Sequence, residues 1–262
     1  MDVIQAIVMG IVEGLTEFLP VSSTGHMILA GHFLGVDQES DFTKTFEIAI
    51  QLGSILAVVF VLYQRFLKGI SVWLKLLVGF VPTGLIGFFA YKYIKNLFVP
   101  QTVAYMLIIG GIVFLWVEWR NKRLPKEVTL KNSLDEVSYK QAFVVGLCQS
   151  LAMIPGTSRS GATIVAGLLV GFSRTLAAEF SFMLAIPTMF AATTYDIYKN
   201  MHIMYSHNLF LLFIGALVAF FTALVSIKLF LGFVSRFSYI PFGIYRILIG
   251  ALMLLYFWKL NA

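Results

Sequence analysis

Six long apolar runs limit the folds open to this chain more than any other feature of its sequence. They cover residues 46–63, 70–91 and 103–119, and then residues 176–195, 209–230 and 241–258. Each run is close to the ~20 residues that an α-helix needs to cross a bilayer. Only 12% of the residues are charged, against about 25% in soluble domains. The sequence therefore predicts an all-α polytopic membrane protein with six transmembrane helices.

The two halves of the chain resemble each other. Shifting the sequence by 136 residues superposes polar and small residues as well as apolar ones, including Gln5 on Gln141, Gly10 on Gly146, Ser22 on Ser158 and Gly25 on Gly161. An apolar bias would not align polar residues, so the pattern indicates a duplication. Each half carries three spans, and an odd number turns the second half over in the membrane. We expect an inverted-topology repeat, whose sites lie near the midplane where broken helices meet.

Each half begins with a pair of apolar segments that are too short to cross a bilayer separately. The pairs, at about residues 3–35 and 141–172, are joined by turns rich in Pro, Ser and Gly. They are predicted to form re-entrant helical hairpins, because non-helical backbone at membrane depth is tolerated only beside a cavity or inside protein. The first repeat then covers residues 1–119 and the second covers residues 141–262. Residues 120–140 are predicted to form a solvent-exposed linker within one integral membrane domain.

The positions of lysine and arginine residues indicate the orientation. In this topology the linker shares its side of the membrane with other basic residues, namely Arg65, Lys68, Arg174, Lys228 and Arg236. Positively charged loops mark the cytoplasmic face, so both termini and the opening of the first hairpin are predicted to lie outside. The formal net charge of +6 comes from these loops rather than from one basic face, which argues against a nucleic-acid partner.

Two carboxylates lie in the first hairpin, within an otherwise apolar segment. Glu13 and Glu17 are four residues apart, which places both side chains on one face of a helix. Ionisable residues at membrane depth are costly and mark functional sites. Two such acids can share a proton or bind a divalent cation through oxygen ligands. We expect Glu13 and Glu17 to bind Mg²⁺ or Ca²⁺, with a solvated helix face as the alternative.

Three hydroxyls and an imidazole follow these acids, at Ser22, Ser23, Thr24 and His26. The hydroxyls can cap the next helix or donate hydrogen bonds to phosphate oxygens, and Ser23 is a candidate nucleophile if a base lies within reach. His26 can take or deliver that proton, or attack phosphorus itself. The sequence leaves open the choice among Ser23, His26 and an activated water.

The second hairpin supplies the opposite charge. Arg159 stands among hydroxyls and glycines, and a guanidinium stays charged and binds phosphate with two parallel hydrogen bonds. Ser158, Ser160 and Thr163 are predicted to line a phosphate-binding turn at the start of a short helix. An ion pair between Arg159 and the acids of the first hairpin is the structural alternative, and it is compatible with catalysis. Together the two stretches predict one site for an anionic, phosphorylated lipid.

These stretches resemble the signatures of the bacterial undecaprenyl-diphosphate phosphatases linked to bacitracin resistance. The likeness rests on Glu13-x-x-x-Glu17 followed by Pro20-Val-Ser-Ser-Thr-Gly-His26, and on Pro155-Gly-Thr-Ser158-Arg159-Ser160-x-x-Thr163. It implies a hydrolase of the bacterial inner membrane that removes the terminal phosphate of the C55 isoprenyl diphosphate. Such an enzyme recycles the carrier lipid for peptidoglycan synthesis and needs Mg²⁺ or Ca²⁺. The resemblance also implies active-site roles for Glu13, Glu17, Ser23, His26 and Arg159.

Inverted repeats with broken helices also occur in transporters, so a secondary transporter or flippase for a polyprenyl phosphate lipid is the alternative function. A transporter would release no phosphate. The sequence leaves open the chain length of the lipid, the metal used in the cell and the oligomeric state. For the last of these, a two-fold homodimer is the commonest arrangement among homo-oligomers.

Overall fold

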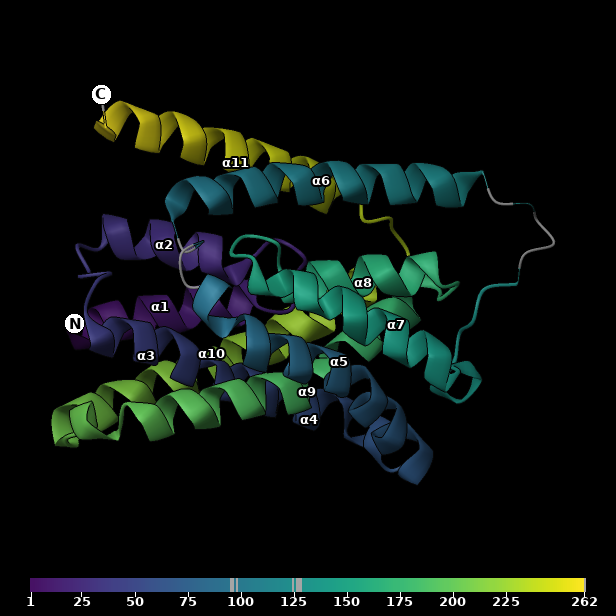
Figure 1. The fold of residues 1–262 in the computed structure, drawn as a ribbon, viewed down its shortest axis with the longest axis horizontal. Coiled ribbons are helices and arrows are strands. Elements are labelled where there is room, and N and C mark those ends of the chain that lie inside the picture. The colour runs from purple at the N-terminus through teal and green to yellow at the C-terminus, as the bar shows by residue number, and fades with distance from the viewer. Residues whose placement is uncertain (95–96, 98, 124, 126–128, 262) are drawn as a thin grey trace.

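The computed structural model describes residues 1–94, 97, 99–123, 125 and 129–261, and the described residues are mostly helical. Helices α1 to α11 follow one another along the chain, with short 3-10 helices between some of them (Figure 1). An isolated bridge between Lys131 and Phe172 is the one β-type pairing within these residues. The predicted all-α class is confirmed.

Within the described residues, six helical segments are long and apolar enough to cross a membrane, judged by length and composition. The first combines α3 (Asp41–Ala49) with α4 (Gln51–Phe66), and the others lie in α5 (Ile70–Ile94), α6 (Pro100–Lys122), α9 (Arg174–Lys199), α10 (Ser206–Val234) and α11 (Ile240–Asn261). They coincide with the six predicted runs, and most of them extend a few residues further. The chain is a multi-pass membrane protein.

The first span differs from the continuous helix that was predicted over residues 46–63. α3 ends at Ala49 and α4 begins at Gln51, and Leu62 inside α4 has a non-helical φ of −105° and ψ of 16°. The hydroxyl of Thr193, in α9, donates to the carbonyl oxygen of Ile48 at 3.1 Å, next to the first break. A side chain from the second half of the chain therefore supplies a partner to backbone that the break leaves irregular.

Two pairs of short helices stand where the hairpins were predicted, α1 (Val3–Thr16) with α2 (Ser23–Phe33), and α7 (Tyr139–Gln149) with α8 (Arg159–Leu169). A 3-10 helix, η3 (Ser150–Met153), follows α7 directly. Within each pair the two helices pack on one another. All four are shorter than the ~20 residues that a transmembrane helix needs.

The local structure repeats at the same shift of 136 residues. α2 and α8 are each 11 residues long, and each follows a serine in the left-handed region, Ser22 with φ 71° and Ser158 with φ 70°. In each half a glutamine of the first short helix donates to the carbonyl oxygen just after the second, Gln5 Nε2 to Leu34 at 3.0 Å and Gln141 Nε2 to Val170 at 2.8 Å. Equivalent residues of the two halves therefore share backbone conformation and hydrogen bonding.

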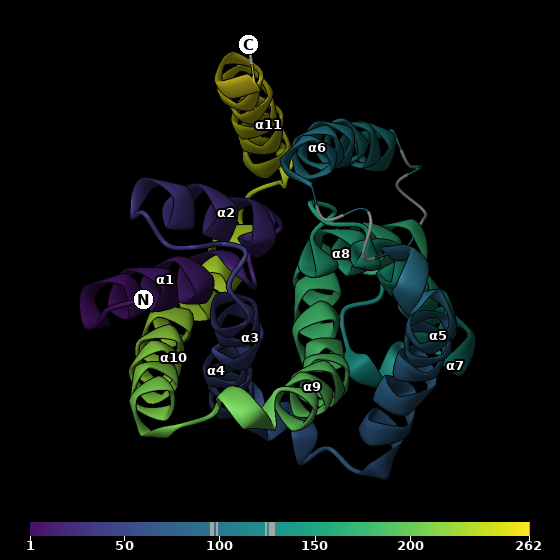
Figure 2. The same ribbon diagram turned by 60° about the vertical axis from the view of Figure 1, so that its left-hand side comes forward.

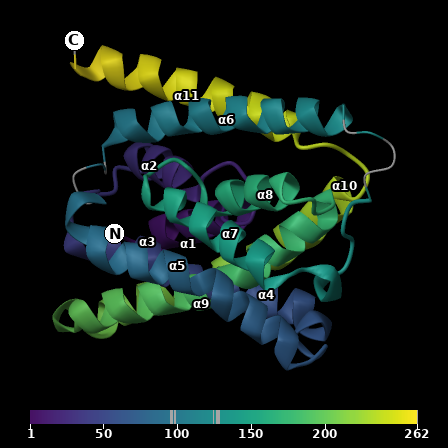
Figure 3. The same cartoon turned by 45° about the vertical axis from the view of Figure 1, so that its right-hand side comes forward.

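Each half packs its first short helix on a long helix of the other half. α1 lies against α10, and α7 lies against α5 (Figure 2). Glycines permit both contacts, because a Cβ at Gly10 would come within 2.6 Å of the Gly215 carbonyl oxygen and a Cβ at Gly146 would collide with the carbonyl of Gly79. α6 and α11, the last long helix of each half, run side by side (Figure 3). The halves are thus interlocked.

The predicted linker, residues 120–140, is shorter and more closely anchored than expected. α6 continues to Lys122 and α7 begins at Tyr139. Leu134 and Val137 are only 3% and 2% exposed, and the buried amine of Lys75 donates to the Leu134 carbonyl oxygen at 2.8 Å. The prediction of a solvent-exposed linker is wrong for these two apolar residues, which bury their side chains in the main core of the protein. Residues 124 and 126–128 of the predicted linker lie outside the described residues.

Candidate functional site

The two acids of the first hairpin lie at the end of α1. Glu13 is 1% exposed inside the helix, and Glu17 is 7% exposed and caps its C-terminus. The backbone N–H of Glu17 donates to the Glu13 carbonyl oxygen at 2.9 Å. Helical spacing therefore continues through Glu17, and the two carboxylates are buried within one turn of each other.

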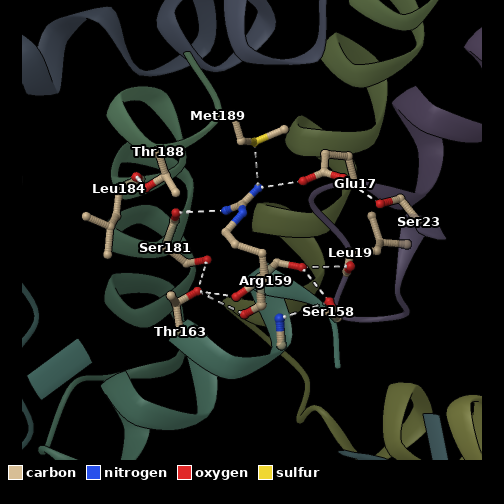
Figure 4. Close-up of polar contacts among 12 residues, drawn as sticks. Glu17, Leu19, Ser23, Ser158, Arg159, Thr163, Ser181, Leu184, Thr188 and Met189 are labelled. Atoms are coloured by element: carbon tan, nitrogen blue, oxygen red, sulfur yellow. Dashed lines mark hydrogen bonds and ion pairs between the residues drawn. The ribbon is translucent and has the colours of Figure 1, made fainter. Parts of the chain in front are cut away.

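Arg159, the first residue of α8, brings the second hairpin to these acids. Its Nη2 lies 3.0 Å from Glu17 Oε1, and its Nη1 donates to the Ser181 carbonyl oxygen at 3.0 Å (Figure 4). The guanidinium also stands over the ring of Phe18, 5.3 Å from its centroid. Two polar stretches that are far apart in the sequence thus meet in one buried cluster.

Ser23 completes a chain of contacts through Glu17. The hydroxyl of Ser23 donates to Glu17 Oε2 at 2.5 Å, in the short range that charge-assisted O–H···O⁻ bonds occupy. Glu17 therefore holds the arginine with one oxygen and the serine with the other (Figure 4). The carboxylate stands where a base must stand to accept the proton of the Ser23 hydroxyl.

His26 contacts other groups. Its Nδ1 lies 2.8 Å from the Ser22 carbonyl oxygen and its Nε2 lies 2.7 Å from the hydroxyl of Tyr245. A carbonyl oxygen only accepts hydrogen bonds, so Nδ1 carries a proton and Nε2 is the acceptor in the neutral ring. The structure pairs Ser23 with Glu17 rather than with His26, which was one candidate to take that proton.

The hydroxyls of the second hairpin hold its turn together. Ser158 accepts from the Gly161 N–H at 3.1 Å, and Ser160 donates to the Leu19 carbonyl oxygen of the first hairpin at 2.9 Å. Thr163 donates to the Arg159 carbonyl oxygen at 2.9 Å and shares a 2.6 Å hydrogen bond with the Ser181 hydroxyl. These bonds position Arg159, and the phosphate-binding roles of Ser158, Ser160 and Thr163 stay predictions.

Several polar atoms around the cluster are buried without a partner in the described structure. They are Glu13 Oε1, Ser22 Oγ, Thr157 Oγ1 and Arg159 Nε. Burying a polar group without a hydrogen bond costs about 1–3 kcal/mol, so such groups need a ligand or water. Thr24, another predicted phosphate-binding residue, lies in the first turn of α2 and is only partly buried. The unpaired atoms include an acceptor for a cation and donors for an anion.

The carboxylates can be tested as a cation site. Among the described residues, no group of three or more His, Cys, Asp and Glu side chains is placed to hold a metal ion. Mg²⁺ is usually bound by one or two carboxylates together with substrate phosphates rather than by a cage of protein ligands. Glu13, with its unpaired oxygen, and Glu17 fit a divalent cation that a phosphorylated ligand also contacts.

Arg246 was missed by the sequence analysis although it is fully buried in α11. Its guanidinium donates to five backbone carbonyl oxygens at 3.0–3.3 Å, those of Pro20, Met106, Leu107, Gly156 and Thr157. Pro20 belongs to the turn of the first hairpin, and Gly156 and Thr157 belong to the turn of the second. An arginine within an apolar run is itself a signal of function, and that signal was available in the sequence.

Comparison with known proteins gives a consistent result. The family described as "Bacitracin resistance protein BacA" matches residues 6–252. A protein of Wolinella succinogenes named undecaprenyl-diphosphatase is 58% identical over 256 residues, which cover 98% of this chain and 98% of that protein. Proteins of the same name from Campylobacter fetus subsp. fetus and Persephonella marina are 60% and 53% identical, covering 98% of this chain and 99% of each relative.

Proposed function

Because this chain belongs to the bacitracin resistance protein BacA family, we propose that it is an undecaprenyl-diphosphatase. It hydrolyses the C55 isoprenyl diphosphate to the monophosphate and inorganic phosphate, which recycles the carrier lipid for peptidoglycan synthesis and confers bacitracin resistance. The observation that carries the chemical proposal is the buried chain of contacts from Arg159 through Glu17 to Ser23. It joins a phosphate-binding cation, a base and a nucleophile in one cluster.

We assign the binding of the diphosphate to Arg159. Without substrate its guanidinium is neutralised by Glu17 at 3.0 Å, and a diphosphate can take over the outward hydrogen bonds because it carries more negative charge. Removal of one donor that stabilises a transition state typically costs 10²–10³-fold in kcat. The bonds of Ser181 and Thr163 keep the arginine in place while its partner changes.

Ser23 is the proposed nucleophile. Its Oγ forms a bond to the terminal phosphorus, the bond between that phosphorus and the bridging oxygen breaks, and the hydroxyl proton passes through Glu17 to the departing monophosphate. A water molecule then attacks the phosphoserine, giving its proton to Glu17, which returns it to Ser23 as inorganic phosphate leaves. A Mg²⁺ or Ca²⁺ ion held by Glu13 and Glu17 would neutralise charge on the diphosphate.

The nucleophile can be identified by rapid quenching with substrate labelled in its terminal phosphate. We expect label on Ser23 in the wild-type protein and no labelled protein in Ser23→Ala. Label on His26 would contradict this step and identify the imidazole as the nucleophile, whereas no labelled protein under any condition would contradict it in favour of direct attack by water.

For the architecture, we propose an inverted repeat with two re-entrant hairpins whose turns meet near the middle of the membrane. The matched φ angles of Ser22 and Ser158, the matched glutamine hydrogen bonds and three spans in each half support it. With positive loops inside, both termini face outward and the site opens to the outer side of the inner membrane. In a Cys148→Ser background, a membrane-impermeant thiol reagent should label Glu39→Cys and not Asn132→Cys in intact spheroplasts.

The enzymatic proposal is tested with purified protein in detergent, C55 diphosphate and a divalent cation. We expect release of inorganic phosphate that a chelator abolishes and that added Mg²⁺ or Ca²⁺ restores. A protein that binds or moves the lipid without releasing phosphate would instead be a transporter or flippase.

A further inference from the structure

Tyr245 of α11 contacts the imidazole of His26 in two ways. Its hydroxyl lies 2.7 Å from His26 Nε2, and the two rings are stacked, with centroids 5.7 Å apart and planes 8° from parallel. The residues are separated by 219 positions in the sequence. The contact therefore joins the last long helix of the second half to the second short helix of the first.

The opposite edge of the imidazole is also held. Ser22, whose backbone has a φ of 71°, presents its carbonyl oxygen to His26 Nδ1 at 2.8 Å. In the neutral ring this places the proton on Nδ1 and leaves the lone pair of Nε2 for the phenol O–H. Both ring nitrogens are thus engaged, and the imidazole links Tyr245 to the backbone carbonyl of Ser22, the residue before Ser23.

The backbone beside Tyr245 is firmly anchored. The next residue, Arg246, donates to carbonyl oxygens in the turns of both hairpins, including Pro20 at 3.0 Å and Thr157 at 3.0 Å. Tyr245 itself is 40% exposed, so its hydroxyl is not needed to fill the core. Tyr245 therefore combines a fixed backbone with a polar hydroxyl at the end of its ring, which suits a residue that orients another side chain.

We propose that Tyr245 is a positioning residue for the reaction, acting through His26. It holds the imidazole in one tautomer and one ring orientation before the lipid binds, so less conformational freedom is lost when the transition state forms. The inference rests on the proposed function, because it assumes that His26, through its contact with the Ser22 carbonyl oxygen, keeps the adjacent Ser23 in place for the phosphatase reaction. The contact itself is a property of the protein whatever its substrate.

The first half of the chain offers a matched control. The segment Tyr105-x-x-x-Ile109-Gly110 corresponds to Tyr245-x-x-x-Ile249-Gly250, and the shift that superposes the hairpins places Ala162 opposite His26. Tyr105 is 56% exposed. Substitution of Tyr105 therefore changes the same type of side chain on the equivalent helix, but removes no described contact with a histidine.

The first readout is enzymatic. Tyr245→Phe keeps the stacked ring and removes only the hydroxyl, and the loss of one neutral hydrogen bond corresponds to about a three- to tenfold effect. We expect kcat to fall by that factor with KM within twofold of wild type, and Tyr105→Phe to leave both unchanged. An unchanged kcat in Tyr245→Phe, or a change confined to KM, would overturn the proposal.

The second readout needs no activity, so it separates this inference from the proposed function. In protein with ¹⁵N-labelled histidine rings, His26→Gln identifies the signals of His26 among the four histidines. We expect neutral His26 to carry its proton on Nδ1, and we expect the Nε2 resonance to move in Tyr245→Phe but not in Tyr105→Phe. A proton on Nε2 in the wild type, or an Nε2 signal indifferent to Tyr245→Phe, would refute the contact. Wild-type protein that shows the contact but releases no phosphate would refute only the phosphatase function.

Discussion

Arg246 provides the sharpest test of how the two hairpins are joined. Its guanidinium is 0% exposed, and its five described hydrogen bonds all go to backbone carbonyl oxygens in the two turns and in α6. A single side chain therefore connects the three segments that frame the cluster. The substitution Arg246→Lys isolates this role, because it keeps the positive charge and reduces the number of N–H donors.

The expected loss follows from counting donors. A lysine ammonium has three N–H donors, whereas arginine has five, so at least two of the five hydrogen bonds are lost. Each hydrogen bond to a charged group contributes about 1.5–3 kcal/mol, so the loss of two lowers the stability of the protein by about 3–6 kcal/mol. In a chain of this size 1 kcal/mol shifts Tm by about 2–4 °C, so Tm should fall by about 6–24 °C.

Activity should fall as well, because the turns adjoin the groups that we propose to be catalytic. Pro20 precedes Ser23 by three residues, and Thr157 precedes Arg159 by two. A misplacement of reacting groups by about 1 Å can cost about 10²-fold in rate. We expect kcat of Arg246→Lys to drop by between about ten- and one hundredfold.

The assay combines thermal unfolding of the detergent-solubilised protein with phosphate release at a temperature below both values of Tm. Arg236→Lys, which changes an exposed arginine, is the matched control and should behave as wild type. Gly110→Ala should reproduce the defect, because a Cβ at that position would collide with the Arg246 guanidinium. Wild-type Tm and kcat in Arg246→Lys would show that the carbonyl contacts do not hold the hairpins together.

Three further outcomes follow from the contacts. Arg159→Ala should lower kcat by about 10²-fold or more, since one transition-state donor is lost, and near-normal phosphate release would refute its role. Glu13→Gln should raise the concentration of Mg²⁺ needed for half-maximal activity, whereas a titration curve like that of wild type would remove Glu13 from the cation site. Gly146→Ala should destabilise the protein by about 1–3 kcal/mol through overpacking against α5, while Gly232→Ala, which meets open space, should not. Equal unfolding temperatures of these two variants would contradict the packing argument.

The structural class of the protein and much of its helix arrangement could be predicted from the sequence. Six apolar runs of bilayer length lead to six spans because lipid leaves the backbone few ways to pair its polar groups. The 136-residue shift likewise anticipates that Ser22 and Ser158 share a conformation. The ion pair of Arg159 could also be expected, because an isolated arginine and two isolated acids in an apolar chain have few other partners.

The details of the site could not be predicted in the same way. The hydroxyl of Ser23 donates to Glu17, whereas the imidazole of His26, also close in sequence, contacts the Ser22 carbonyl oxygen and the hydroxyl of Tyr245. Tyr245 and Arg246 enter the cluster from α11, more than two hundred residues away from the turn that they hold.

Hydropathy and spacing report what each segment requires of its surroundings, and that information is local. Charge, length and repetition are therefore visible in the order of the amino acids. The partner of a particular hydrogen bond depends instead on distances of about 3 Å and on direction, and these are set only when helices from both halves pack together. For this reason the sequence indicates which residues are candidates for the chemistry, whereas their pairing is set by the packing of the two halves.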